Sequence, residues 1–502
     1  MMKYNLIATM FIAFTISALQ LNGQNLTLEE CGTGDSPEHI SKWLQSIDHD
    51  AIRFENNDTT WMAAQLFLIH HPNGNVGILI DSLMSTMRVL NRRFAPAKMQ
   101  FYLAGPPKFI PNADWASPPS KQMFEDVIDS FNIARVVNIY FTNLGSQGLC
   151  GYAYYPNSGP GQTVRRGAAV MSYSCSQPNS GTLAHELGHF FSLPHPFQGT
   201  SGNPQSPTAE RVTRDFQEVQ PRLAANCNST GDFFCDTPAD PYGARWQCIS
   251  NPATFDINGD RFFADSTLVM SYAANNCRDI FSQQQMNAMN LTIASQSASR
   301  GYLTVFPKPT PDAITALPTP TIPADGETGL HPNFIHLHWT AVSGAEWYHV
   351  TIRRSSLPNI LTFDTLVSAT SMSIYNNKLL SNTSYQWAVR PANRVDYMPK
   401  AFNWQTFTTG QPTAASLREY QADELAFYPN PVGQQDVLKL LNPIQESTTV
   451  VVSNLQGQTV LQFDLAPGTH HLALESRLSA GTYIFRMMSR HKQQTQRIVV
   501  MP

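Results

Sequence analysis

The sequence lacks an excess of positive charge. Its 33 Lys and Arg are outnumbered by 37 Asp and Glu, which gives a formal net charge of −4 at pH 7. A protein that binds nucleic acid needs a basic surface to neutralise phosphates. The composition therefore argues against nucleic acid as a partner, and we predict none.

After the N-terminus, the sequence also lacks any apolar run long enough to span a bilayer. The longest apolar run, Leu6–Leu19, covers 14 residues and follows Lys3, whereas a spanning helix needs about 20. This pattern is typical of a signal peptide, with cleavage near Gly23–Gln24. We therefore predict an exported protein that is not an integral membrane protein.

Cysteine is scarce and unevenly placed. None of the seven cysteines follows residue 277, and an even set within one exported region is typical of three disulfides. The spacing leaves their pairing open. Cys31 stands apart from the others, so it is either an incidental thiol or a metal ligand. The remaining cysteines are Cys150, Cys175, Cys227, Cys235, Cys248 and Cys277.

Residues 182–195 contain three histidines and one glutamate at the spacing of a catalytic zinc site. His185 and His189 are four residues apart, so they project from one face of a helix and can bind one ion. His195 can join them only if the helix ends and the chain turns back. Three imidazoles leave one position of Zn²⁺ open, and Glu186 lies where it can hold a water there. Chance is the alternative, but the third histidine makes coincidence rare.

The motif and its surroundings resemble the pappalysin-like (cytophagalysin) metzincin metalloendopeptidases over roughly residues 60–308. Leu268–Tyr272 and Cys277 match the family's Met-turn segment, and Gly151–Pro156 resembles its substrate-binding edge. The resemblance implies one catalytic Zn²⁺ and hydrolysis of peptide bonds in protein or peptide substrates. Ser192 departs from the family, which usually has glycine where the chain reverses; at positive φ a serine costs about 1 kcal/mol.

The resemblance also implies roles for single residues around the metal. His185, His189 and His195 would bind zinc, Glu186 would act as the general base, and Tyr272 would donate to the oxyanion. Met270 would form the apolar floor of the site; a methionine packed in the core is the simpler interpretation, and both can hold together.

Cysteine roles are implied in the same way. Cys31 resembles a pro-segment cysteine that binds zinc and keeps the enzyme latent. The resemblance favours a Cys248–Cys277 disulfide. For the four remaining cysteines we expect Cys150–Cys175 and Cys227–Cys235, a pairing that the sequence alone does not fix.

Two acidic clusters in the irregular segment 196–268 suit structural Ca²⁺, because short-spaced oxygen ligands surround a glycine. An Asx turn without an ion is the alternative for both. The second cluster runs from Asp256 to Asp260. The first resembles a calcium-binding segment of the family and comprises Asp232, Asp236, Thr237 and Asp240.

Substrate specificity is indicated by Asn276 and Arg278, on either side of Cys277. Family members that cleave before Arg or Lys resemble one another in an Asp near this cysteine, and this chain has no acid between Tyr272 and Cys277. A half-buried guanidinium would repel a basic P1′ side chain and could pair with a carboxylate. We predict a bias against Lys and Arg at P1′. The alternative is that Arg278 turns away to pair with Asp279 or another acid.

Apolar periodicity predicts strands that alternate with helices before the motif, which indicates an α/β domain. We expect strands at residues 61–71, 99–103, 134–144 and 168–173, and helices at residues 76–94, 121–131 and 282–299.

The composition changes after residue 305, where a stiff Pro-rich linker begins. Short alternating strands then resemble a fibronectin type III module, for which a spacer role is the simplest reading. The tail resembles the C-terminal sorting domain of type IX secretion cargo. The predicted boundaries are 1–23 for the signal peptide, 24–57 for the pro-segment, 58–305 for the protease domain, 306–323 for the linker, 324–410 for the fibronectin-like domain and 424–502 for the sorting domain.

The sequence thus predicts a multidomain protein. An α/β (α+β) metzincin-type catalytic domain is followed by two small all-β sandwich domains. We expect a monomeric zinc endopeptidase, secreted or on the bacterial cell surface, that uses the type IX secretion machinery. The alternative is a surface adhesin or binding protein with a low-turnover metal site, which would have no need of Glu186.

Overall fold

The computed structural model describes residues 31–49, 58–72, 77–157, 167–249, 254–295, 300–375, 379–397 and 402–411, and most of 427–501 in short stretches. The predicted signal peptide lies outside the described residues, as do parts of the predicted pro-segment. Among the described residues, no helix is long and apolar enough to cross a membrane.

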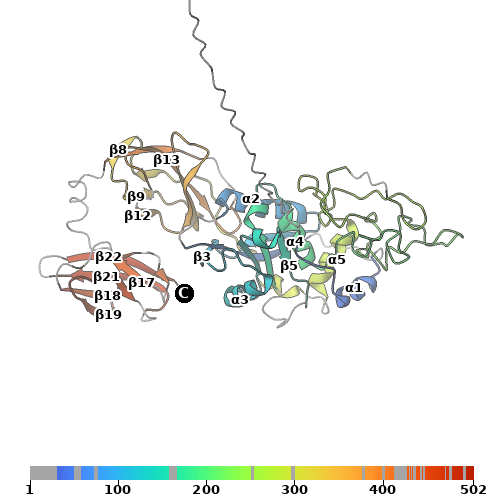
Figure 1. The fold of residues 1–502 in the computed structure, drawn as a ribbon. Coiled ribbons are helices and arrows are strands. Elements are labelled where there is room, and N and C mark those ends of the chain that lie inside the picture. Colours follow the sequence, from blue (N-terminus) through green and yellow to red (C-terminus); the bar gives the residue numbers. More distant parts are fainter. Residues whose placement is uncertain are drawn as a thin grey trace, which may run out of the picture.

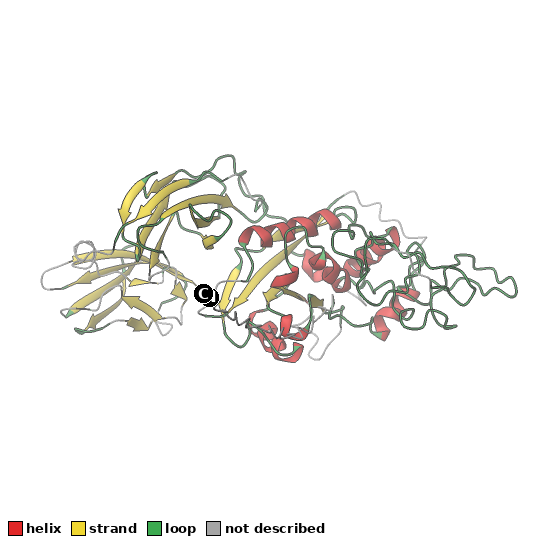
Figure 2. Ribbon diagram, turned by 45° about the horizontal axis from the view of Figure 1, so that its top comes forward, coloured by secondary structure: helices red, strands yellow, loops and turns green. Residues whose placement is uncertain are grey.

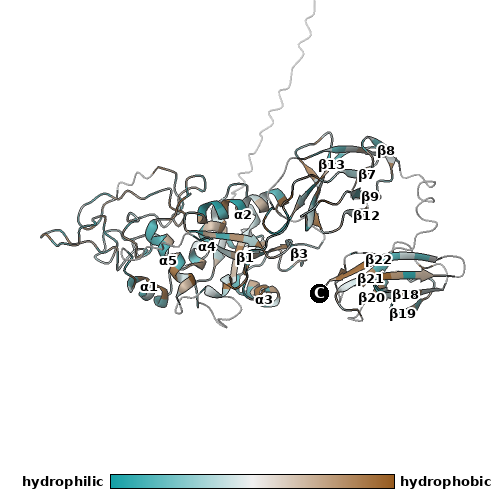
Figure 3. Ribbon diagram, turned by 180° about the vertical axis from the view of Figure 1, so that it is seen from behind, coloured by the Kyte–Doolittle hydropathy of each residue, from teal (hydrophilic) through white to brown (hydrophobic). Residues whose placement is uncertain are grey.

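The protease region is built on a six-stranded mixed sheet with the order β2-β1-β4-β6-β5, in which β3 also pairs with β1. β1 is almost continuously apolar because both faces of the sheet are covered, as the brown colouring in Figure 3 shows. β5 runs antiparallel to β6 and forms one edge. The strands are β1 (Thr60–His70), β2 (Met99–Leu103), β3 (Lys108–Pro111), β4 (Val137–Thr142), β5 (Gly151–Ala153) and β6 (Ala168–Ser172).

Helices cover both faces of this sheet (Figure 1). One face shares a core with α1, α2, α4 and α5, and the other packs against α3. Ser120 caps α3 by accepting from Met123 N at 3.3 Å, and Ser282 and Gln285 form a capping box on α5. The helices are α1 (Glu38–Gln45), α2 (Ile80–Phe94), α3 (Lys121–Phe131), α4 (Thr182–Phe190) and α5 (Gln283–Ala294).

The predicted elements lie close to the observed ones. The strand at 99–103 and the helix at 121–131 have the predicted bounds. The strand predicted at 134–144 is shorter, because Arg135 has a φ of 62° and breaks the extended backbone before it. The helix predicted from residue 76 begins at Ile80.

Between α4 and α5, the chain forms an irregular lobe beyond α5 in Figure 1. In its described parts, residues 191–249 and 254–282, there are isolated bridges but no helix or strand. Two disulfides, Cys227–Cys235 and Cys248–Cys277, hold the lobe together.

Two all-β units follow, each with two packed sheets (Figure 2). The first encloses a core around Trp339 and Trp387, and the second a core around Phe485. The first has strands β7 (Pro320–Ile322), β8 (Glu327–Leu330), β9 (Phe334–Trp339), β10 (Trp347–Arg354), β11 (Leu361–Val367), β12 (Ser371–Tyr375), β13 (Ser384–Ala392) and β14 (Gln405–Thr409). The second has β15 (Phe427–Tyr428), β16 (Val432–Gly433), β17 (Val437–Leu440), β18 (Thr448–Asn454), β19 (Thr459–Leu465), β20 (His471–Ala473), β21 (Gly481–Met488) and β22 (Gln493–Met501).

Candidate metal centre

Three imidazoles converge where the sequence motif predicts a metal. His185 and His189 project from the buried helix α4, and His195 lies beyond its end. The Nε2 atom of His195 is 3.2 Å from that of His185 and 3.0 Å from that of His189. Cys31 lies beside the three histidines. The four ligand atoms, one from each residue, all lie within 4.8 Å of one another.

The protonation of these rings fits a cation. His185 Nδ1 lies 2.8 Å from the Val269 carbonyl, and His189 Nδ1 lies 2.7 Å from the Leu193 carbonyl. Each Nδ1–H therefore donates away from the centre and leaves an unprotonated Nε2 facing it. Burial lowers the pKa of all three rings, to about 3 for His189. Nitrogen lone pairs this close repel one another unless a cation lies between them. Three imidazole nitrogens are a donor set that Zn²⁺ prefers.

A helix-terminating turn brings His195 back to α4. Leu193 N donates to Gly188 O at 3.0 Å and Ser192 N donates to His189 O at 2.9 Å, which is the Schellman pattern. Ser192 occupies the left-handed position of this turn with a φ of 75°. The departure from glycine therefore leaves the turn intact.

Met270 packs against α4 near the imidazoles, and Tyr272 lies beside the rings of His185 and His195. Met270 is fully buried, and a Cβ on Gly188 would lie 2.2 Å from its Sδ atom. Only glycine allows α4 to approach this methionine so closely. The Tyr272 ring lies 4.9 Å from that of His195 between centroids.

Glu186 is fully buried beside the imidazoles, and two groups of the predicted pro-segment reach it. The Cys31 thiol donates to Glu186 Oε2 at 3.4 Å, and the Thr33 hydroxyl lies 3.3 Å from the same oxygen. Burial raises the pKa of the Cys31 thiol well above its usual value, and the nearby Glu186 charge raises it further.

The same segment follows the edge strand β5. Gly32 N donates to Gly151 O at 2.7 Å, and Ala153 N donates to the Thr33 hydroxyl at 2.9 Å. Lys121, from the start of α3, donates to the Gly32 carbonyl. Sequence reasoning missed Thr33 and Lys121, because neither belongs to a motif and both act across long separations in the chain.

Arg278 points inward and Asn276 outward. The Arg278 side chain is buried, and its Nη1 donates to Ser271 O at 3.1 Å and lies 3.2 Å from His185 Nδ1. Its Nη2 donates to Asn275 Oδ1. Asn276 is exposed. The guanidinium thus lies directly behind a candidate zinc ligand.

Asp279, the acid offered as the alternative partner of Arg278, has other cationic neighbours. It pairs with Arg92 at 2.7 Å and with Arg93 at 3.4 Å.

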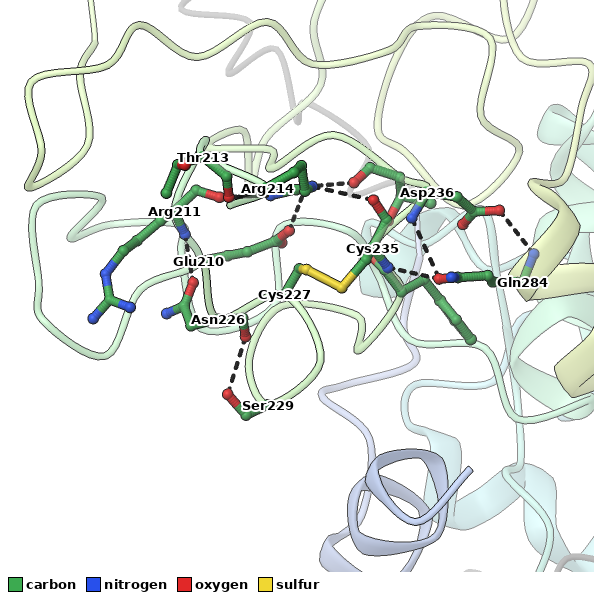
Figure 4. The surroundings of a disulfide bond; sticks show 12 residues. Glu210, Arg211, Thr213, Arg214, Asn226, Cys227, Ser229, Cys235, Asp236 and Gln284 are labelled. Carbon is green, nitrogen blue, oxygen red and sulfur yellow. Dashed lines mark hydrogen bonds and ion pairs between the residues drawn. A yellow bond between two sulfur atoms is a disulfide. The ribbon is translucent and has the colours of Figure 1, made fainter. Parts of the chain in front are cut away.

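Two residues of the first predicted acidic cluster lie close to a third buried acid, Glu210, which the sequence did not predict. Asp232 and Asp240 are buried in the lobe, close to the buried Glu210. Figure 4 shows Glu210 with its partner Arg214, near the Cys227–Cys235 disulfide. Burial raises the pKa of Asp232 and of Asp240 to about 7 each, and that of Glu210 well above its usual value. One oxygen each of Glu210 and Asp240 has no hydrogen-bond partner within the described structure.

The other two residues predicted for this cluster have partners of their own. Thr237 Oγ1 donates to Asp232 Oδ1 at 2.9 Å. Asp236 accepts from Ser282 Oγ at 2.7 Å and from Gln284 N at 2.8 Å, so it caps α5.

The second acidic cluster is an Asx turn. Asp256 Oδ1 accepts from the backbone N–H groups of Asn258 at 2.9 Å and Asp260 at 2.8 Å. Asp256 Oδ2 accepts from Val212 N at 3.0 Å. Because the chain itself satisfies this carboxylate, the turn is explained without an ion.

The structure pairs six cysteines as Cys150–Cys175, Cys227–Cys235 and Cys248–Cys277, and leaves Cys31 as a buried free thiol.

Comparisons with known proteins match two parts of the chain. Residues 119–294 match a peptidase family model described as pregnancy-associated plasma protein-A, and residues 426–501 match a secretion system C-terminal sorting domain. An extracellular metalloprotease of Pyricularia oryzae is 27% identical over 243 residues, which cover 45% of this chain and 72% of the relative. Extracellular metalloprotease 1 of Coccidioides posadasii is 30% identical over 173 residues, 32% of this chain and 52% of the relative.

Solved structures give more distant similarities. Mature mirolysin of Tannerella forsythia, in complex with a cleaved peptide, is 19% identical and covers 50% of this chain and 97% of its own, with a TM-score of 0.38. A fibronectin-type structure named FN3tt covers 19% of this chain with a TM-score of 0.16.

Proposed function

We propose that this chain, a pappalysin-like metalloendopeptidase with a C-terminal secretion sorting domain, is a zinc enzyme that cleaves proteins once its pro-segment leaves the cleft. The convergence of three Nε2 atoms beside a buried carboxylate supports this most strongly. His185, His189 and His195 would hold Zn²⁺, which supplies Lewis acidity that polarises the carbonyl and lowers the pKa of a water.

Glu186 acts as the general base in this proposal. Its carboxylate accepts from Cys31, so it can accept equally from a water in that place. It takes the proton as the water attacks the peptide carbonyl and then gives it to the leaving amine. Tyr272 donates to the oxyanion; in support, its hydroxyl already donates to a main-chain carbonyl in the cleft, that of Cys31, at 3.4 Å.

Substrate backbone binds along β5. The hydrogen-bonding groups of Gly151 and Ala153 that now engage Gly32 and Thr33 become available when the pro-segment leaves. An extended peptide at a sheet edge recovers these bonds whatever its side chains are. The edge therefore suits protein substrates of varied sequence.

Latency follows from the same contacts. Cys31 is the candidate fourth zinc ligand, and the Thr33 hydroxyl hydrogen-bonds to the carboxylate of Glu186. Ile40 and Leu44 of α1 anchor the segment in the catalytic core. The pro-segment thus occupies the metal, the base and the substrate edge together.

Arg278 biases the enzyme against Lys and Arg at P1′. Its buried charge lies beside His185, where a second cation would be repelled across a medium of low dielectric constant. The exposed position of Asn276 favours Arg278 over Asn276 as the residue responsible. Peptide-library profiles of the wild type and of Arg278→Ala test this, and a P1′ preference for Arg or Lys in the wild type contradicts it.

Structural Ca²⁺ is the second proposed ion. Glu210, Asp232 and Asp240 bring three carboxylates into a buried space beside one guanidinium, Arg214, which donates to Glu210 at 2.8 Å. The two unpartnered carboxylate oxygens provide the hard ligands that Ca²⁺ needs.

Metal removal and return tests the proposed function. Treatment of the processed enzyme with o-phenanthroline should abolish cleavage of a protein substrate, and added Zn²⁺ should restore it. Full activity after zinc has been shown to be removed would contradict the proposal. Absence of cleavage by the processed, zinc-loaded protein would instead favour the alternative of an adhesin or binding protein.

A further inference from the structure

The fibronectin-like module, defined here as residues 320–409, lies against the catalytic region. It is adjacent to α2 in both Figure 1 and Figure 3. In the catalytic sheet, β2 and β5 are at opposite ends of the strand order. The module contacts the β2 edge, away from the β5 edge that borders the metal centre.

Apolar side chains of the module are buried in the catalytic core. Trp347 of β10 is 2% exposed, and Tyr397, after β13, is 6% exposed. Both belong to the cluster that contains Ile80 and Met84 of α2. A free module would expose this tryptophan and this tyrosine to water, which is unfavourable for large apolar side chains.

The module also caps α2. The N-cap residue of that helix, Leu79, provides no side-chain bond. Asp364 of β11 accepts from Ile80 N at 2.8 Å and so satisfies one of the unpaired N–H groups of the first turn. Arg390 of β13 pairs with Asp81 one residue later.

His349 connects these charged side chains in one network of contacts. Its ring contacts Asp364 on one side and Arg390 on the other, and Arg390 pairs with Asp81. All residues of this network except Asp81 belong to the module.

The edge strand β2 is covered by the segment after β13. Leu103 N donates to Arg394 O at 2.9 Å, and the Tyr397 hydroxyl donates to Phe101 O at 3.3 Å. Asn91 of α2 donates to the Tyr397 hydroxyl at 2.8 Å. An uncovered strand edge invites pairing with other chains, so proteins protect such edges. Here the module provides the protection.

We propose that the fibronectin-like module is a permanent part of the catalytic unit and stays on the mature protease. α2 packs against α4, which carries two of the imidazoles, and Phe94 of α2 contacts Phe191 at the end of α4 with 5.9 Å between ring centroids. Removal of the module would uncap α2, open the β2 edge and loosen the support of the metal helix. If the module were only a spacer on a flexible tether, its removal would have none of these effects.

Cleavage of the linker after folding tests the association directly. A specific protease site is inserted after Leu317, which is 36% exposed, and the full chain is cut in the native state. The two fragments should elute together from a size-exclusion column, and calorimetry should show the module and the protease unfolding in one transition. Separation of the fragments, with the protease fragment unfolding at its original temperature, would overturn the proposal.

Point variants provide a second test that does not require cleavage. Val350→Ala alters the module's own core, yet it should lower by several degrees the temperature at which the protease region unfolds, because the two are coupled. Arg390→Met should do the same by breaking the pair with Asp81, whereas the matched control Arg354→Met should have little effect. An unchanged protease transition in both Val350→Ala and Arg390→Met would overturn the proposal. Calorimetry detects this coupling whether or not the protein is a zinc peptidase, so failure of either proposal is recognised separately.

Discussion

Replacement of Ser192 by alanine should destabilise the protein more than replacement by glycine. Ser192 occupies the left-handed position of the turn that ends α4, with a φ of 75°. A Cβ in this region costs about 1–2 kcal/mol. Serine and alanine both carry that Cβ, and glycine removes it.

Two smaller effects oppose the gain from glycine. The Thr292 hydroxyl donates to Ser192 Oγ at 3.0 Å, a bond worth about 1 kcal/mol. Glycine also adds freedom to the unfolded chain, which costs about 0.4–1 kcal/mol. Ser192→Gly should therefore change the free energy of unfolding little. Ser192→Ala loses the bond and keeps the strain, so it should lower that free energy by about 1 kcal/mol.

Thermal unfolding of the full chain measures this difference. A loss of about 1 kcal/mol lowers the midpoint by roughly 2–4 °C in a domain of this size. Thr292→Val removes this hydrogen bond together with the contacts of the same hydroxyl to Phe191 O and Ala288 O, so it should destabilise the protein at least as much as the alanine variant. An alanine variant at least as stable as the glycine variant would refute the reasoning about backbone strain.

Three further predictions concern latency, export and calcium. In the full proenzyme, Cys31→Ala should give activity before processing, and Thr33→Val should shift in the same direction to a smaller extent; unchanged latency in both, measured with a quenched peptide, would assign inhibition to the bulk of the segment. Deletion of residues 424–502 should trap the protein in the periplasm of its native host, and normal levels in the medium on immunoblotting would argue against the sorting role. Without Ca²⁺, the raised pKa values of Asp232 and Asp240, about 7 each, mean that the folded state binds more protons than the unfolded one, so the unfolding temperature should fall as pH rises from about 4 to about 7. Added Ca²⁺ should remove this fall, and a pH dependence that Ca²⁺ leaves unchanged would contradict the site.

The convergence of the three imidazoles could be predicted from the sequence because the residues that carry them are local. A four-residue spacing on a helix places His185 and His189 on one face, and the turn after Phe191 needs only a few residues to return His195. The bounds of α3 and β2 were also predictable, since each has a clear apolar period and lies between loop residues.

Long-range contacts could not be predicted in this way. Thr33 meets Glu186 across 153 residues, and Asp364 caps α2 across 284 residues. No local period encodes such pairs. The same holds for Glu210, which joins the buried acids only after the lobe has folded.

Asp236 shows a further long-range contact that the sequence did not predict. Its place in an acidic run indicated a calcium ligand, but the first turn of α5 takes both of its oxygens. A helix N-terminus distant in the sequence can compete with an ion for the same carboxylate, and ligation of Ca²⁺ by Asp236 stays a prediction.

The role of Glu186 as general base is tested most directly by the isosteric variant Glu186→Gln. Zinc content and the cleavage rate of a protein substrate are measured together on processed enzyme, with the exposed Glu218→Gln as the matched control. We predict one zinc per chain in wild type and both variants, with a rate reduced by several orders of magnitude only in Glu186→Gln. Cleavage by zinc-loaded Glu186→Gln at close to the wild-type rate would contradict the account.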